Sequence, residues 1–204
     1  MNHGHHPRFH LGIFGGSGTG KTTYALRFLS HCKSSCCFVF DPDGEFARGL
    51  NVAPARTVFE LDAAIRTGFV CFDPHTMFPG RLEAALEYFA RLALAAGARL
   101  RGRKLFVVDE LGWYVNGSNI GHWLRVLVQS GRRKAGIDGV FLAQAPNELH
   151  NFVRAQLTEV VCFQLTEDCA LENPKKFGFD VDAVRALKPY EFICRNNRGQ
   201  EVRG

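Results

Sequence analysis

The chain has 204 residues, of which 46% are hydrophobic and 22% charged, and its formal net charge is +5. This composition is typical of a soluble globular protein, and the length suits one domain with a full core. No run approaches the roughly 18 uncharged apolar residues of a membrane span, and the amino terminus lacks the apolar core of a signal peptide. The positive charge permits a polyanionic partner without requiring one.

Strand-like and helix-like runs alternate along the chain. The strand-like runs, several of them continuously apolar, are 9–14, 36–41, 68–73, 104–109, 139–144, 159–165 and 191–195. The helix-like runs are 21–31, 58–66, 79–98, 120–131, 147–157 and 181–188. Continuously apolar strands are typical of a sheet covered on both faces. The alternation therefore predicts an α/β fold with a mainly parallel central sheet and helices on both faces.

The chain is expected to comprise a flexible His-rich arm at 1–8 and a single domain at 9–204. Its seven cysteines are odd in number, and several lie in apolar runs, which indicates free thiols in a reducing, intracellular setting. A zinc site at 31–37, which holds a histidine and cysteines, is the less favoured alternative. No second pair of ligands stands at a familiar spacing.

A glycine-rich segment follows the first predicted strand. It has the sequence GGSGTGKT at 15–22 and fits the phosphate-loop pattern G-x-x-x-x-G-K-[ST]. In such a loop the glycines turn backbone N–H groups toward an anion, and the next helix directs its positive dipole end at the phosphates. Lys21 is expected to reach the β- and γ-phosphates, and Thr22 to ligate Mg²⁺. The residues expected to bind ATP are Gly15, Gly16, Ser17, Gly18, Thr19, Gly20, Lys21, Thr22 and Thr23.

The apolar run at 105–108 ends in two acids, Asp109 and Glu110. Downstream of a phosphate loop, the first acid of such a pair holds Mg²⁺ through water, and the second polarises the attacking water. A phosphotransferase must keep water away from the γ-phosphate, whereas a hydrolase needs a base beside it. The pair therefore favours hydrolysis of ATP.

Two further candidates lie in the segment 130–150. Gln144 ends a predicted strand and is expected to hydrogen-bond the γ-phosphate or its water. Arg132 or Arg133 is a candidate arginine finger for a neighbouring subunit, although both cations also suit the carboxyl end of a helix dipole. Asp41, at the end of the second predicted strand, either faces the ligand crevice or belongs to a plain turn.

Four segments occur in one order: GGSGTGKTT, FVFDPDGEF, LFVVDE and GRRKAGIDGVFLAQAPNEL. Together they resemble the FtsK–HerA superfamily of DNA-pumping ATPases, which implies a RecA/FtsK-like P-loop NTPase fold. The resemblance covers about residues 9–163 and places Arg133 where the family carries its arginine, with Arg132 one place off. Ala143 stands where the family usually has Thr or Ser, which is a mild departure.

Within that superfamily, the chain is expected to be a bare motor core, similar to the genome-packaging ATPases of icosahedral DNA viruses with an internal membrane and double-jelly-roll capsids. The resemblance implies a homo-oligomeric ring, a hexamer or pentamer, that hydrolyses ATP with Mg²⁺ and drives double-stranded DNA into a preformed capsid. Capsid or portal-vertex proteins are the implied partners, and the host cytoplasm or the virion the implied location.

Basic loops are the candidates for DNA contacts, which would be phosphate contacts with little sequence preference. For the turn at 99–104, a solvated loop is an equally good interpretation. The candidate DNA-binding residues are Arg99, Arg101, Arg103, Lys104, Lys175 and Lys176.

Three other functions compete with the packaging motor. One is an assembly ATPase resembling the zonula-occludens-toxin-like proteins of filamentous phages, which normally have a membrane span. Another is a small-molecule or nucleotide kinase, against which the neighbouring acids Asp109 and Glu110 stand. The third is a nucleotide-binding scaffold without turnover.

Overall fold

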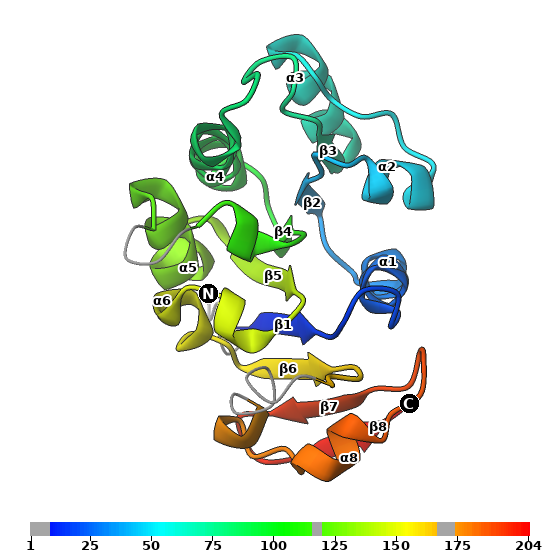
Figure 1. The fold of residues 1–204 in the computed structure, drawn as a ribbon. Coiled ribbons are helices and arrows are strands. Elements are labelled where there is room, and N and C mark those ends of the chain that lie inside the picture. The colour runs from blue at the N-terminus through cyan, green and yellow to red at the C-terminus, as the bar shows by residue number, and fades with distance from the viewer. Residues whose placement is uncertain (1–8, 116–119, 167–173) are drawn as a thin grey trace.

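Eight strands form one sheet, in the order β3-β2-β4-β5-β1-β6-β7-β8, in the computed structural model (Figure 1). The structure describes residues 9–115, 120–166 and 174–204, so the predicted arm at 1–8 lies outside the described residues. The strands are β1 His10–Phe14, β2 Cys36–Phe40, β3 Phe69–Phe72, β4 Lys104–Val108, β5 Ile137–Ala143, β6 Glu159–Cys162, β7 Ile193–Asn196 and β8 Glu201–Arg203.

The helices alternate with the strands, as predicted. The α-helices are α1 Lys21–His31, α2 Glu45–Leu50, α3 Val58–Thr67, α4 Leu82–Gly97, α5 His122–Ala135, α6 Asn151–Arg154 and α8 Val181–Arg185, and the 3₁₀ turns are η1 Leu111–Trp113 and η2 Pro146–Glu148. Strands β1 to β6 pair in parallel, whereas β7 and β8 add antiparallel at one end. The predicted α/β fold with a mainly parallel sheet is confirmed.

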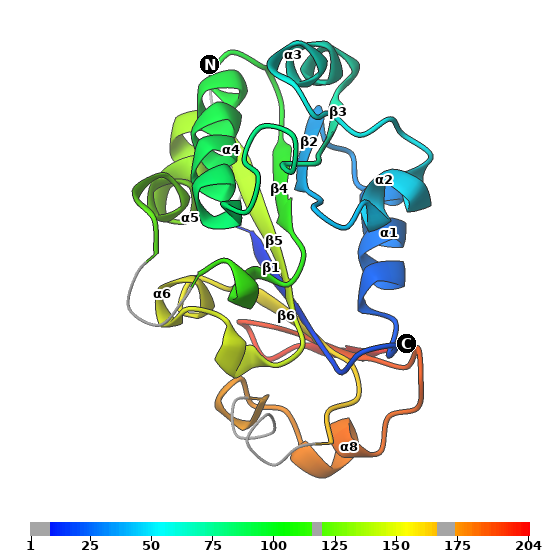
Figure 2. The same cartoon turned by 45° about the horizontal axis from the view of Figure 1, so that its top comes forward.

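Both faces of the sheet are covered by helices. Figure 2 shows α4 and α5 on one side of the strands and α1 and α2 on the other. Successive residues of β2 point to opposite faces, so Phe38 packs in the core under α4 while Val39 packs in the core under α1. This two-sided burial explains the continuously apolar strands of the sequence.

The parallel strands bring several loops to one edge of the sheet. Since parallel strands share a direction, the residues after β1, β4, β5 and β6 all emerge at the carboxyl edge. Strand β5 lies between β1 and β4. The residue after β5 is therefore located between the phosphate loop and the two predicted acids, which is the arrangement that positions the candidate site.

Two helix predictions differ most from the structure, while those at 79–98 and 181–188 are shortened to Leu82–Gly97 and Val181–Arg185. The helix predicted at 147–157 is divided into η2 and α6, because the ring of His150 accepts the N–H of Phe152 (3.1 Å) and begins a new helix there. The helix predicted at 120–131 continues to Ala135, where Gly136 ends it with a φ of 67°. Gly131 stays helical inside α5, where a Cβ would lie 3.5 Å from the carbonyl oxygen of Ile137 in β5.

Helix α2 was not predicted, since the residues just before it, Pro42, Asp43 and Gly44, are typical of a turn. Asp41 is 3% exposed and accepts the backbone N–H groups of Phe46 (3.1 Å) and Ala47 (2.8 Å) in the first turn of that helix. Burial raises the pKa of this carboxyl, and the bonds from α2 oppose that shift. Asp41 thus stabilises the start of α2, and the turn interpretation of this residue is the closer one.

No helix in the described part of the chain has the length and apolar character needed to cross a lipid bilayer.

Candidate active site

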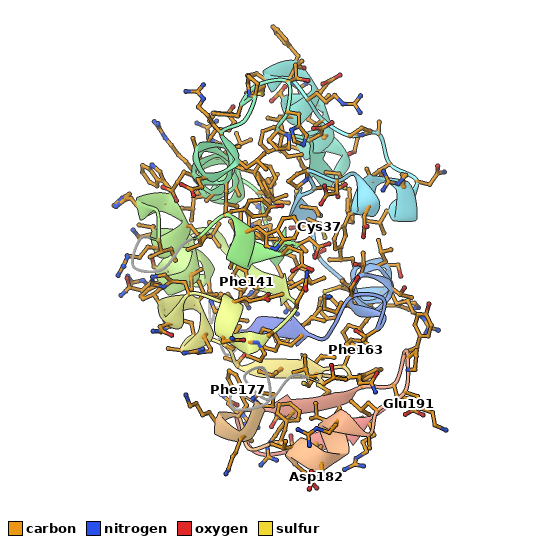
Figure 3. All side chains as sticks on the ribbon, viewed as in Figure 1. Cys37, Phe141, Phe163, Phe177, Asp182 and Glu191 are labelled. Atoms are coloured by element: carbon orange, nitrogen blue, oxygen red, sulfur yellow. The ribbon has the colours of Figure 1, made fainter. Side chains whose placement is uncertain are left out.

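The predicted phosphate loop is bonded to the strands on both sides of it. Gly15 donates its backbone N–H to the carbonyl of Gln144 (3.2 Å), just after β5, and Gly16 donates to the carbonyl of Gln164 (3.1 Å), after β6. A Cβ on Gly15 would lie 2.5 Å from the Cβ of Phe163, which Figure 3 labels between β6 and α1. The loop therefore has a fixed place between two strand ends.

The amino end of α1 leaves its N–H groups available to an anion. Gly20 caps the helix with a φ of 113° and without a side-chain hydrogen bond. Gly18 has a φ of 75°, and no described atom lies within 4 Å of the position that its Cβ would take. Left-handed backbone of this kind suits glycine, and an uncapped helix start binds phosphate through its N–H groups and dipole.

Lys21 contacts both the phosphate loop, which follows β1, and Glu110, which follows β4, although β5 lies between these two strands. Its side chain is 7% exposed, and its Nζ donates to the carbonyls of Gly15 (2.8 Å) and Gly16 (3.3 Å). The same Nζ lies 3.6 Å from Oε1 of Glu110. The structure thus brings together a loop cation and an acid that are far apart in the sequence.

Glu110 has an unusual backbone and an unpaired carboxylate oxygen. It adopts φ 45° and ψ 48°, a left-handed conformation that costs a non-glycine residue about 1–2 kcal/mol and recurs at functional sites. Its Oε2 is buried and has no hydrogen-bond partner among the described residues. A buried acceptor left unpaired is costly. The carboxylate therefore fits a water or another donor entering the cleft.

The two acids have raised pKa values. Burial is the largest cause for Asp109, followed by repulsion from Glu110 and Glu45, and together they raise the pKa of Asp109 to about 7 against the attraction of Lys21. Burial also raises the pKa of Glu110, and Lys21 opposes this shift. Negative charge is concentrated in this cleft, so a cation entering it would be attracted and would favour the ionised acids.

Replacing Asp109 by Asn is expected to raise the melting temperature of the metal-free and nucleotide-free protein by roughly 5 °C at pH 8. The carboxyl of Asp109 ionises near its ordinary value of 3.8 in the unfolded chain but near 7 in the folded protein. Ionisation therefore destabilises the folded state as the pH rises from about 4 to 7. The gain should shrink as the pH falls across that window, as scanning calorimetry would measure.

Asp43→Asn is the matched control, because Asp43 lines the same cleft but is exposed. This variant should change the melting temperature by less than about 1 °C at either pH. An Asp109→Asn gain of equal size at pH 4 and pH 8 would contradict an ionisation effect.

Gln144 contacts the loop and is oriented by a residue that the sequence did not identify. Its carbonyl accepts from Gly15, and its backbone N–H donates to Oε2 of Glu148 (2.9 Å). The same oxygen accepts from Ala145 (3.3 Å). Glu148 therefore holds the backbone of Gln144 at the edge of the cleft, beside the loop.

The cleft has a volume of about 300 Å³ and includes residues that the sequence analysis did not select. Three of them are Asp43, from the turn before α2, Glu45, the first residue of α2, and Tyr190, from the loop before β7. The Asp-Pro-Asp-Gly-Glu sequence was the available signal for the first two, because it follows a buried strand at the carboxyl edge. The lining is Ser17, Gly18, Gly20, Lys21, Thr22, Thr23, Asp43, Glu45, Asp109, Glu110 and Tyr190.

The residues of the cleft fit a magnesium ion bound with a triphosphate. Mg²⁺ takes hard oxygen ligands and keeps several waters beside one or two carboxylates and substrate phosphates. The hydroxyl of Thr22 and the carboxylate of Asp109 line the same cleft. Within the described ranges, no group of three or more His, Cys, Asp or Glu residues could hold a metal ion by itself. A metal here would need phosphate and water as its other ligands.

The two candidate finger arginines lie at the opposite edge of the sheet from the cleft. They end α5, just before β5 begins, whereas the loop contacts the residue after β5. A strand of this length spans about 20 Å. Arg132 pairs with Asp138 (3.1 Å), a carboxylate that is 1% exposed. Arg133 is exposed, with no ion pair to another described residue. Neither arginine belongs to the cleft of its own chain.

The basic turn before β4 lies at this same amino edge. Arg103 donates to Asp138 (2.7 Å) and lies over the ring of Phe9 (4.8 Å). Lys104 is 2% exposed, and its Nζ donates to the carbonyls of Leu100 and Ala135. The structure does not support a DNA contact from Lys104, because its ammonium is buried. The exposed members of the predicted DNA-binding set are Arg99, Arg101, Lys175 and Lys176.

The fold closely matches solved structures of viral packaging proteins. The genome packaging NTPase B204 of Sulfolobus turreted icosahedral virus 2, in complex with ATPγS, aligns over 97% of both chains with a TM-score of 0.75 and 15% identity. The DNA-packaging ATPase B204 of Sulfolobus turreted icosahedral virus aligns over the same shares with a TM-score of 0.75 and 18% identity. The chain has the fold of a genome-packaging NTPase.

A more distant match is the pCW3 conjugation coupling protein TcpA, with a TM-score of 0.57 and 13% identity over 96% of this chain and 59% of that one. No model of a known protein family matches the sequence, and no curated protein matches it. At these identities the likeness establishes the fold. The P-loop NTPase fold expected from the four motifs is thus confirmed.

Proposed function

We propose that this protein is an ATPase that packages double-stranded viral DNA into a preformed capsid as a homo-oligomeric ring. The observation that carries the proposal is the contact of Lys21, from the phosphate loop, with Glu110, from the acidic strand end, at 3.6 Å. It supports hydrolysis because the cation that would bind the γ-phosphate lies beside the acid that would activate water. The whole-chain match to the B204 packaging proteins supports the role in genome packaging.

The loop and α1 would bind the triphosphate. The uncapped N–H groups of α1 and the glycine turns face the phosphates, and Lys21 exchanges its contacts with loop carbonyls for phosphate oxygens. Mg²⁺, held by Thr22 and through water by Asp109, would neutralise charge on the β- and γ-phosphates. ATP is the substrate in this scheme, and its triphosphate provides the anion that the loop is built to hold.

Glu110 would be the general base. Its unpaired Oε2 accepts a proton from a water that attacks the γ-phosphorus, and the bond from that phosphorus to the β-bridging oxygen breaks to give ADP and phosphate. Gln144, held by Glu148 and by the loop, would orient that water through its side-chain amide. Because Lys21 lies 3.6 Å from Glu110, a phosphate that binds to Lys21 would change the electrostatic environment of this base.

The ring would complete each site from a neighbour. Arg133 is exposed at the amino edge of its own sheet, so it is available to the carboxyl-edge cleft of an adjacent subunit. Arg132 is less suitable, because it already neutralises the buried Asp138. Double-stranded DNA would be held through phosphates by exposed cations, with Arg99, Arg101, Lys175 and Lys176 as candidates, and capsid or portal-vertex proteins would hold the ring at the particle.

Double-stranded DNA is expected to stimulate ATP turnover at low salt, and the stimulation should decline steeply as the salt concentration rises. A motor that grips phosphates releases counterions from the DNA, so its affinity falls with salt. Phosphate release, measured with and without DNA between about 50 and 200 mM salt, tests this. The Lys21→Ala variant is the background control for a contaminating ATPase. Turnover that no DNA alters at any salt concentration would contradict the translocation role.

A further inference from the structure

The loop before β7 projects an exposed aromatic ring into the candidate nucleotide cleft. Tyr190 is 65% exposed and lines the cleft together with the phosphate loop. Its φ is 70°, in the left-handed region that a tyrosine rarely adopts. Strained backbone of this kind persists where the surroundings impose it, and it is common at ligand sites.

The position of Tyr190 is coupled directly to the phosphate loop. Its backbone N–H donates to the carbonyl of Thr19 (2.8 Å), and a Cβ on Gly20 would lie 2.8 Å from Cδ1 of the Tyr190 ring. Two residues further along the chain, the ring of Phe192 packs against Tyr24 of α1 at 4.9 Å between centroids. Figure 3 labels Glu191 on this loop, beyond the edge of α1. The backbone of Tyr190 and the ring of Phe192 therefore hold this loop against the start of α1.

The strand order separates the two ends of a bound nucleotide. The acids follow β4, on one side of β1, whereas the loop of Tyr190 precedes β7, on the other side. Each lies two strands, or about 10 Å, from β1. With its terminal phosphate beside Lys21 and Glu110, a nucleotide bound in the loop extends its sugar and base toward the side of Tyr190.

From this arrangement we infer that Tyr190 is a stacking platform for the nucleobase, a binding residue for purine nucleoside triphosphates. The inference rests on the proposed nucleotide site. The ring offers a π-face, and it is the aromatic member of the described lining of the cleft. Stacking uses the face that every base has and not its hydrogen-bonding edge. ATP and GTP should therefore bind with affinities within about 5-fold of each other.

The test compares ligands with and without a base. Wild type, Tyr190→Phe and Tyr190→Asn are titrated calorimetrically with ADP and with inorganic tripolyphosphate in the presence of Mg²⁺. Phe keeps the ring, whereas Asn removes it and tolerates left-handed backbone, and both keep the N–H bonded to Thr19. Tyr190→Asn should bind ADP about 10- to 100-fold more weakly and tripolyphosphate as wild type does. Tyr190→Phe should match wild type for both ligands.

Two results would overturn the inference. One is that Tyr190→Asn binds ADP with the same affinity as wild type. The other is that Tyr190→Asn loses affinity for ADP and for tripolyphosphate by the same factor. Wild type alone gives a second measurement, because without a base contribution it would bind ADP no more tightly than pyrophosphate. In turnover assays Tyr190→Asn should raise the KM for ATP and leave kcat within about 2-fold, since the ring is remote from the reacting atoms. Wild type that binds none of these ligands would refute the nucleotide site itself.

Discussion

Replacing Glu110 by Gln is expected to reduce ATP turnover by at least about 100-fold while the protein still binds ATP. Glutamine has nearly the same shape but accepts no proton from water. The phosphate loop and Lys21 stay intact, so binding should persist. Removing the negative charge 3.6 Å from Lys21 leaves that cation free for phosphate, and ATP affinity should stay equal or rise. Single-turnover phosphate release and equilibrium binding of ATP measure the two quantities separately.

Glu45→Gln is the comparison variant, because it removes the same charge from the same cleft. Glu45 is exposed at the first position of α2 and raises the pKa of Asp109 only through its charge. Its replacement should change turnover by less than about 5-fold. Similar losses in both variants would indicate a general loss of negative field in the cleft. Full turnover in Glu110→Gln would instead point to a scaffold that binds nucleotide without a base at this position.

The elements that form the site were predictable because each depends on local chemistry. The helix predicted at 21–31 has the bounds found in the structure, since loop glycines precede it and Cys32 leaves it in extended backbone. Apolar runs likewise predicted β1 and β4, which are followed by the phosphate loop and by the two acids. The order of the strands, which determines that these ends meet, depends on pairing between distant segments and required the structure.

The contacts that were not predicted join residues far apart in the chain. Asp138 interrupts an apolar run, so β5 was predicted to begin later, at 139. Its charge is balanced by Arg103 and Arg132, and it also accepts the N–H of Phe9, 129 residues away. Tyr190 is likewise far in sequence from its partner, because its backbone N–H bonds to the carbonyl of Thr19 in the phosphate loop. No local sequence signal indicates this bond. Arg132 consequently has a structural partner that its sequence context did not indicate.

Mixing Lys21→Ala with Arg133→Ala is expected to restore ATP hydrolysis that neither variant has alone. If a cleft takes Lys21 from its own subunit and Arg133 from a neighbour, a random one-to-one ring contains competent sites wherever an Arg133→Ala subunit receives the arginine of a Lys21→Ala subunit. About a quarter of sites satisfy this condition. Each variant alone should be inactive, since an arginine finger contributes about 10³-fold or more in rate. Phosphate release from mixtures at several ratios measures the recovery.

Substitutions of the two residues that flank Arg133 at the carboxyl end of α5, Arg132 and Lys134, are the controls for the mixing experiment. Lys134→Ala removes an adjacent exposed cation and a similar share of the helix-dipole interaction, so it should keep wild-type turnover. Arg132→Ala removes a partner of the buried Asp138 and should lower the free energy of unfolding by about 1–2 kcal/mol, because Arg103 remains to pair with that carboxylate. If ATP hydrolysis recovers when Lys21→Ala is mixed with Arg132→Ala but not with Arg133→Ala, Arg132 would be the residue that acts across subunits. A mixture that stays inactive at every ratio, although rings form, would mean that no arginine of this helix end acts across subunits.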